Sequence, residues 1–311
     1  MDRAGARILL CVLFCLRMTG ASAAAKGQGT SAEQSGHGRE FWREIAKNHY
    51  AVPAGQEAFP LAKELSGYLG LPDPELRDDL AYSILAVWIT RQKMLSTEEL
   101  VTLLEEWQAN LRAGIGETGT DSIFKRSFSA LCLSALAERD LKEPFLGEAL
   151  FRTLLNAALT YLGDERDLRG FDAKKGWIHT TAHTADLLAA LAENKFFTKQ
   201  DQERVLKAIT QRLATANEVF SYGEQDRLAN VAATIASRND FDGGGWSSWV
   251  AQIDKEDRVA WNDSPPKMEA LARFQNDSYF LSATAAQILL RSASGTSAEA
   301  QKSVLAVLRH R

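Results

Sequence analysis

The sequence is poor in cysteine and proline, and its charges are nearly balanced. Only 3 of the 311 residues are Cys, which excludes a small scaffold held together by many disulfides. A formal net charge of −4 provides no basic footprint for nucleic acid. Because 45% of the residues are hydrophobic, the chain is not of the disordered class, and we expect a soluble globular protein with one large core or two modest ones.

Proline is clustered near the start of the chain and at positions 265–266, with one more residue between these clusters. The 7 prolines are Pro53, Pro60, Pro72, Pro74, Pro144, Pro265 and Pro266. Since proline breaks a helix interior, residues 75–264 can be interrupted by proline only at position 144. Apolar residues in this stretch recur at helical spacing, and no β-branched run alternates as a strand would. The sequence therefore predicts an all-α fold.

The predicted helices are of moderate length and separated by short breaks. They include residues 76–88, 100–111, 123–136 and 145–162, followed by 178–193, 199–216, 223–238, 267–292 and 297–309. Short connections favour antiparallel neighbours, so we expect stacked antiparallel helices in an α-solenoid or α/α array. No fixed-period sequence repeat is visible. Residues 39–311 are expected to form a single all-helical domain.

The N-terminus contains the only long apolar run, and its layout is typical of an export signal. Arg3 and Arg7 precede the apolar segment 8–16, and Arg17 ends that segment before it is long enough to span a membrane. Ala21-Ser22-Ala23 matches a small-residue cleavage pattern. The sequence predicts a signal peptide over residues 1–23.

Cleavage would change the composition of the mature chain. It is expected after Ala23 or, as the second choice, after Ala25, and residues 24–38 are expected to form a disordered linker. Loss of three arginines and one aspartate changes the net charge from −4 to −6, and Cys132 remains as a lone, buried thiol. We expect a periplasmic or secreted protein with no membrane span after cleavage.

Two histidines and an aspartate share one face of the predicted helix at 178–193. At about 100° per residue, His183 lies about 40° from His179, and Asp186 about 20° to the other side. Imidazole and carboxylate are ligands for zinc or a similar divalent ion, so His179, His183 and Asp186 form a candidate metal site. Thr180 stands where zinc proteases of the His-Glu-x-x-His type have glutamate. The alternatives are a structural polar seam between helices and metal-free acid–base chemistry.

A second polar cluster begins the predicted helix at 223–238. Glu224 and Asp226 complement the helix dipole, and Arg227 suits a surface partner. Because one helix intervenes, the helices at 178 and 224 should begin at the same edge of an antiparallel array. Glu224 or Asp226 could then reach the histidine face, and the helix N-termini would favour an anionic ligand group.

A glycine- and tryptophan-rich segment follows at 241–249. Three glycines permit a tight, exposed loop. Trp246 and Trp249 lie on one helical side, which is typical of core residues; if exposed, they could stack on a sugar or peptide, as could Trp261.

Three segments carry a resemblance to a known family. GWIHTTAHTADLL (176–188), FKRSFSALCLSAL (124–136) and YGEQDRLA (222–229) together resemble the bacterial family called domain of unknown function 2785. The resemblance extends from about Phe59 to Leu290 and implies an all-helical bacterial protein, but no reaction. The polar positions that match are His179, His183, Asp186, Glu224, Asp226, Arg227 and Arg126.

Three functional hypotheses follow from these patterns. The first is an exported, helical-repeat-like scaffold that binds a small molecule or protein through the His/Asp pocket. The second is a metal-assisted hydrolase that uses His179, His183 and Asp186, with Glu224 or Asp226 as a further ligand or base. The third is a carbohydrate-active α/α protein that uses Trp246 and Trp249.

Overall fold

The computed structural model describes residues 36–260, 264–291 and 295–311. The predicted signal peptide and most of the predicted linker lie outside these residues. The elements are α2 (Arg39–Lys47), α3 (Ala58–Tyr68), the π-helix η1 (Glu75–Tyr82), α4 (Ser83–Thr90), α5 (Thr97–Asn110), α6 (Ser122–Lys142), α7 (Glu148–Asp164), β1 (Phe171–Asp172), β2 (Gly176–Trp177), α8 (Thr180–Ala192), α9 (Lys199–Thr215), α10 (Glu224–Ala236), α11 (Gly243–Ala260), α12 (Met268–Leu290) and α13 (Gly295–Leu308). The all-α prediction is confirmed.

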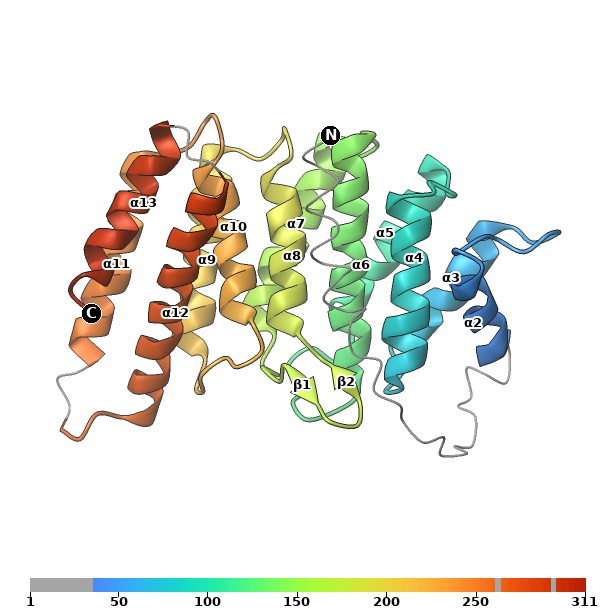
Figure 1. Cartoon of the computed structure of the whole chain (residues 1–311), viewed down its shortest axis with the longest axis horizontal. Helices are drawn as coiled ribbons and strands as arrows, with labels where there is room; N and C mark the ends of the chain where they lie inside the picture. Colours follow the sequence, from blue (N-terminus) through green and yellow to red (C-terminus); the bar gives the residue numbers. More distant parts are fainter. Residues whose placement is uncertain (1–35, 261–263, 292–294) are drawn as a thin grey trace.

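Alternate helices form a row that runs the length of the molecule (Figure 1). In this row α4 packs on α6, α6 on α8, α8 on α10 and α10 on α12. Helices α7, α9 and α11 pack in sequence behind the row, and α13 packs against α11 and α12. Consecutive helices are antiparallel, so α6, α8, α10 and α12 all begin at the lower rim of the view and end at the upper rim. The predicted stacking of antiparallel helices is confirmed.

The core is formed by the apolar faces that these helices bury against one another. Its largest fully buried side chains include Trp42, Trp88, Trp107 and Trp246. Cys132 is also buried, as expected, and burial raises the pKa of its thiol far above the usual range. Within the residues that the structure describes, no helix is both long and apolar enough to cross a bilayer.

Local sequence explains where several helices begin. Ser96 caps α5 through a capping box: its hydroxyl accepts from the Glu99 amide while the Glu99 carboxylate accepts from the Ser96 amide. Thr198 and Asp201 form the same arrangement at the start of α9. Each box satisfies amides that a helix N-terminus leaves without intrahelical partners.

Four local expectations need correction. Residues 76–88 do not form a regular α-helix, because η1 occupies the first half and continues directly into α4. Residues 171–177 form a small antiparallel hairpin. Each of its strands has only two residues, which is too short for an alternating pattern to be visible in the sequence. Residues 243–245 begin α11 instead of forming a loop. His37, assigned to the linker, stacks on Phe41 at 3.9 Å and its Nδ1 lies 2.8 Å from Glu64 Oε2.

Candidate functional site

His179 connects the start of α8 to the loop that precedes α10. It occupies the N-cap position in the left-handed region, with φ of 51°. Its Nε2 lies 2.9 Å from the carbonyl oxygen of Tyr222, so this nitrogen carries the proton and donates. Its ring stacks on Trp177 at 4.3 Å. The expectation that the two helices begin at the same edge is confirmed by this contact.

His183 connects α8 to α6. Its Nδ1 lies 2.9 Å from the hydroxyl oxygen of Ser127, and that hydroxyl donates its own proton to the carbonyl of Ile178. Nδ1 must therefore be the donor to Ser127. The ring also meets the edge of Phe128 at 5.0 Å and lies 5.7 Å from the ring of His179, nearly perpendicular to it.

Both histidines are neutral at pH 7 because they are buried. Burial lowers the pKa of His179 to about 4, although the bond to Tyr222 opposes the shift. Burial also lowers the pKa of His183 well below its usual value, and the neighbouring His179 and Arg227 add to that shift. Because the His183 ring is bonded to α6 and the His179 ring to the loop before α10, the geometry favours the structural seam among the alternatives.

Asp186 does not complete a metal site with the histidines. Its Oδ2 lies 2.5 Å from Arg227 Nη1, so the carboxylate forms an ion pair with α10. Burial raises the pKa of Asp186, while Arg227 opposes the shift. Among the residues that the structure describes, no three His, Cys, Asp or Glu side chains are grouped so that they could hold a metal ion. The predicted convergence of His179, His183 and Asp186 is not found, because each already has another partner.

The two acids that begin α10 have different surroundings. Glu224 is buried, its Oε2 accepts the Tyr222 amide at 2.9 Å, and burial raises its pKa. Asp226 is exposed at the surface. The Glu224 carboxylate already supplies negative charge at the α10 N-terminus, where the sequence suggested a place for an anionic ligand.

Two buried arginines hold the loops at this rim, and only one was singled out from sequence. Arg77, in η1, donates to the carbonyls of Lys175 at 2.6 Å and Trp177 at 3.2 Å, and thereby fixes the hairpin. Arg126 forms a fully buried ion pair with Glu165. The arginine in η1 follows no motif, so its role depends on a contact between positions about 100 residues apart that spacing does not reveal.

A polar stripe runs along α6, α8 and α10 from the Asp186–Arg227 pair toward the upper rim. We define it as Glu138, Asp186, Arg227 and Asn230, all of which are half-buried. Glu138 forms no hydrogen bond or ion pair with the described residues. Burial raises the pKa of Glu138 to about 7, and Asp186 adds to this shift. Glu138 was not among the residues predicted from the sequence, although an acid directly after the apolar run 128–137 was a visible signal.

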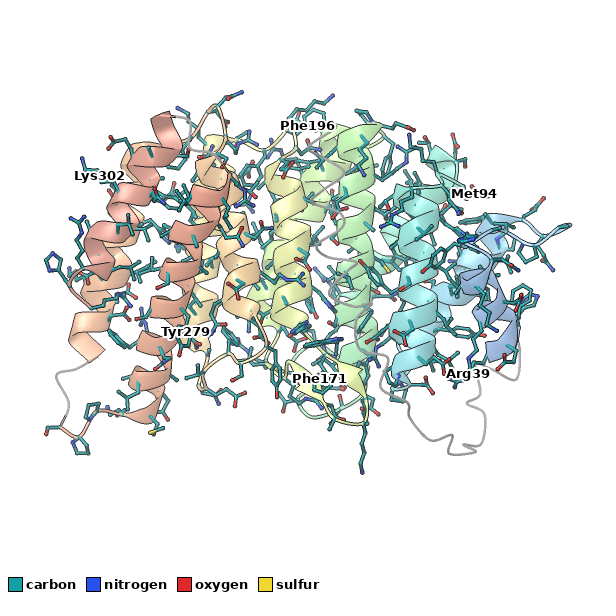
Figure 2. The ribbon with its side chains drawn as sticks, viewed as in Figure 1. Arg39, Met94, Phe171, Phe196, Tyr279 and Lys302 are labelled. Carbon is teal, nitrogen blue, oxygen red and sulfur yellow. The ribbon has the colours of Figure 1, made fainter. Side chains whose placement is uncertain are left out.

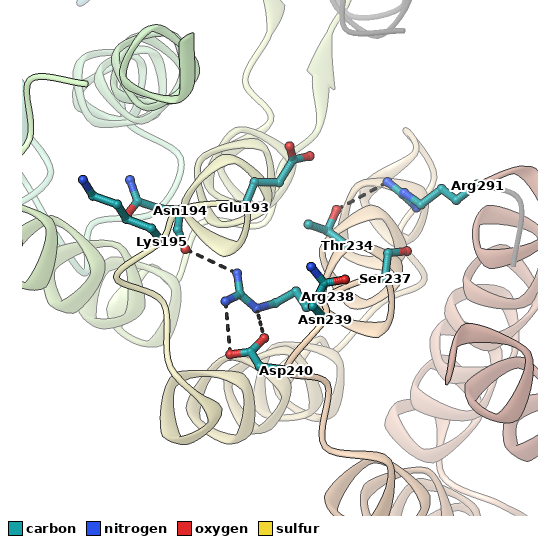
Figure 3. Close-up of a pocket in the computed structure, with 9 residues that line it drawn as sticks. All are labelled: Glu193, Asn194, Lys195, Thr234, Ser237, Arg238, Asn239, Asp240 and Arg291. Carbon is teal, nitrogen blue, oxygen red and sulfur yellow. Dashed lines mark hydrogen bonds and ion pairs between the residues drawn. The ribbon is translucent and has the colours of Figure 1, made fainter. Parts of the chain in front are cut away.

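The stripe leads to a cleft at the upper rim (Figure 3). Arg291 connects the two, because it donates to the side chains of Asn230 and Thr234. The cleft has a volume of about 460 Å³. It is lined by Glu193, Asn194, Lys195, Thr234, Ser237, Arg238, Asn239, Asp240 and Arg291.

The prediction that Trp246 is a core residue is confirmed, and the alternative of an exposed sugar-binding platform is wrong there. Trp246 is 1% exposed, and its indole donates to the carbonyl of Ala300 at 3.1 Å. Trp249 is half-buried and donates to Thr210 at 2.6 Å. Both rings serve the packing of α11, because the helix places that side against the core; Trp261 lies outside the described residues.

Comparison with protein families places these residues in a known group. The family model described as "Protein of unknown function (DUF2785)" matches residues 111–286, more than half of the chain. The chain belongs to the DUF2785 family. The DUF2785 match includes the histidine seam, the polar stripe and most of the cleft, from α6 to most of α12. No curated protein matches the chain, and no solved structure matches it.

Proposed function

We propose that the chain is a binding protein whose ligand is a small polar molecule with a cationic amine, held in the cleft and along the polar stripe. The observation that carries this proposal is Glu138, a half-buried acid that forms no hydrogen bond or ion pair with the described residues, next to the Asp186–Arg227 pair. A buried carboxyl without a partner is costly when charged. An ammonium group of the ligand would remove that cost.

The upper rim also suits a cation. Helices α8, α10 and α12 end there, and their C-cap residues Glu193, Ser237 and Arg291 line the cleft. The C-terminal end of a helix carries partial negative charge. Three cations also line the cleft, and each has contacts of its own. Asp240 and three backbone carbonyls accept the hydrogen bonds of Arg238. Arg291 donates to Asn230 and Thr234, and the Lys195 ammonium lies over the ring of Phe196.

The histidine seam serves this function by fixing the helices that carry the stripe. His183 joins α8 to α6, and His179 joins it to the start of α10. The three helices that supply Glu138, Asp186 and Arg227 are thereby kept in register. The histidines themselves need not touch the ligand.

Thermal unfolding with spermidine as the probe tests the proposal. Spermidine should raise the Tm of the wild-type chain, and Glu138→Gln should remove most of that rise. Glu105→Gln is the matched control, because Glu105 is an exposed acid on α5 and neutralises the same charge. An equal response in the two variants, or no response in the wild type, would refute the proposed site.

We further propose that the chain is exported, because the positive, apolar and small-residue segments of the first 23 residues follow in the order of a signal peptide. Expression in a bacterium followed by mass spectrometry of the extracytoplasmic fraction tests this. The expected N-terminus is Ala24, or Lys26 for the second cleavage position. An intact chain that begins at Met1 and stays in the cytoplasm would contradict it.

A further inference from the structure

The rim opposite the cleft carries exposed aromatic side chains. Phe171 is 41% exposed and Tyr222 is 46% exposed, although both come from segments that are otherwise tied to the core. Their ring centroids are 6.1 Å apart, and Trp177 lies 4.9 Å from Phe171. Val219, also exposed, belongs to the same loop as Tyr222. We call Phe171, Trp177, Val219 and Tyr222 the aromatic rim; Figure 2 labels Phe171 at the lower edge of the molecule.

Hydrogen bonds and close packing fix the backbone that carries these rings, so the aromatic rim has a defined geometry. The carbonyl of Tyr222 accepts from His179, and its amide donates to Glu224. The hairpin that carries Phe171 is held by Arg77. Gly170 passes so close to Tyr222 that a Cβ there would lie 2.4 Å from its ring. Exposed apolar groups held in one geometry are typical of a recognition surface.

Two of the cations around the aromatic rim are held in ion pairs. Arg169 pairs with Asp167 at 2.6 Å, and Lys175 pairs with Asp121 at 2.6 Å. Asp172 accepts the backbone amides of Lys174 and Lys175. Such surroundings do not favour a phosphate-rich or strongly cationic ligand. They suit a neutral ligand that offers flat apolar faces and hydroxyl groups together.

We propose that the aromatic rim is a carbohydrate-binding surface that stacks pyranose rings of a neutral oligosaccharide on Phe171 and Tyr222. The C–H bonds on one face of a pyranose carry slight positive charge, and they pack on the negative face of an aromatic ring. Hydroxyl groups at the sugar edge then reach the polar side chains beside the hairpin. This surface is separate from the cleft, and the proposal does not depend on the function assigned to the cleft.

Calorimetric titration of the purified chain with cellohexaose, chitohexaose, xylohexaose and maltohexaose tests the proposal. At least one of these glycans should bind, and Phe171→Ala and Tyr222→Ala should each weaken that binding about fivefold to tenfold. Tyr222→Phe keeps the ring and should bind within about twofold of the wild type. Tyr279→Ala is the matched control, because Tyr279 is 50% exposed on α12 and should leave binding unchanged.

The same titration with decaproline distinguishes a peptide surface from a sugar surface. The proposal is overturned if none of the four glycans binds, or if the alanine variants at 171 and 222 bind a glycan as well as the wild type. It is also overturned if decaproline alone binds and loses affinity in Phe171→Ala. Glu138→Gln should bind the glycan normally, so failure of the cleft proposal and failure of this one give different results.

Discussion

His179 combines a left-handed backbone conformation with a buried, neutral ring, and this combination gives it a measurable role. Only glycine and a few polar residues such as asparagine adopt that conformation at low cost. The ring is simultaneously stacked on Trp177 and bonded to Tyr222. The protein therefore gains stability from a histidine that must stay unprotonated.

The pH dependence of stability should report this role. The folded-state pKa of His179 is lowered to about 4 from an ordinary value of 6.5, so its contribution is present above pH 6.5 and is lost as the pH falls toward 4. His179→Asn tolerates the backbone and removes the titration. We expect the wild type to lose about 1–2 kcal/mol more than this variant between pH 7 and pH 5, measured by urea unfolding. His310→Gln, at an exposed histidine, should keep the wild-type slope.

Glu138 should show the opposite dependence. Its folded-state pKa is raised from 4.5 to about 7, so stability is lost as the pH rises through that interval, because the unfolded chain releases the proton first. Glu138→Gln should match the wild type at pH 5 and exceed its free energy of unfolding by about 1–2 kcal/mol at pH 8. Equal free energies of unfolding of the two proteins at pH 8 would show that the charged Glu138 carboxylate does not destabilise the folded chain.

The residue types in the sequence predicted where polar side chains gather, but not which of these side chains pair with one another. Helical spacing placed His179, His183 and Asp186 on one face, and two of the three do approach each other. Asp186 forms an ion pair with Arg227, because a buried carboxylate is stabilised far more by a guanidinium than by neutral imidazoles. Such pairing depends on a neighbouring helix, which periodicity within one helix cannot report.

At the scale of elements, the long periodic helices were predictable and the short connecting structures were not. The predicted helices 199–216 and 223–238 differ from α9 and α10 by no more than two residues at either end. Their buried faces repeat over several turns, and this makes the period visible. The hairpin at 171–177 has only two residues in each strand. Its shape is set by Arg77 from another part of the chain, so no local pattern encodes it.

Removal of that arginine should release the hairpin. Arg77→Met eliminates the bonds to the carbonyls of Lys175 and Trp177, so trypsin should cleave after Lys174 and Lys175 much sooner than in the wild type. Mass spectrometry of timed digests measures the cleavage sites. Arg126→Met is the matched control, since Arg126 is also fully buried but bonds to Glu165. Equally rapid hairpin cleavage in both variants would mean that global destabilisation, not release of the hairpin, is responsible.

At the scale of the whole molecule, the row of helices makes contacts mainly between neighbours. Helix α8 packs on α6 and α10, and α10 on α12, while α2 and α3 lie at one end and α11 and α13 at the other (Figure 1). In arrays of this kind, stability is close to a sum of local and nearest-neighbour terms. The histidine seam, polar stripe and aromatic rim all occur in the middle of the row, where helices have neighbours on both sides.

Hydrogen exchange should therefore respond to end mutations locally. Trp246 packs α11 on α13 and Trp42 packs α2 at the opposite end, and both are fully buried. Each alanine variant should cost about 3–5 kcal/mol within its own end of the row. Trp246→Ala should speed amide exchange in α11 and α13 and leave α2 and α3 unchanged, while Trp42→Ala should do the reverse. Protection of α8 should survive both changes, because its neighbours remain folded. Uniform acceleration along the chain in either variant would show instead that the row unfolds as one cooperative unit.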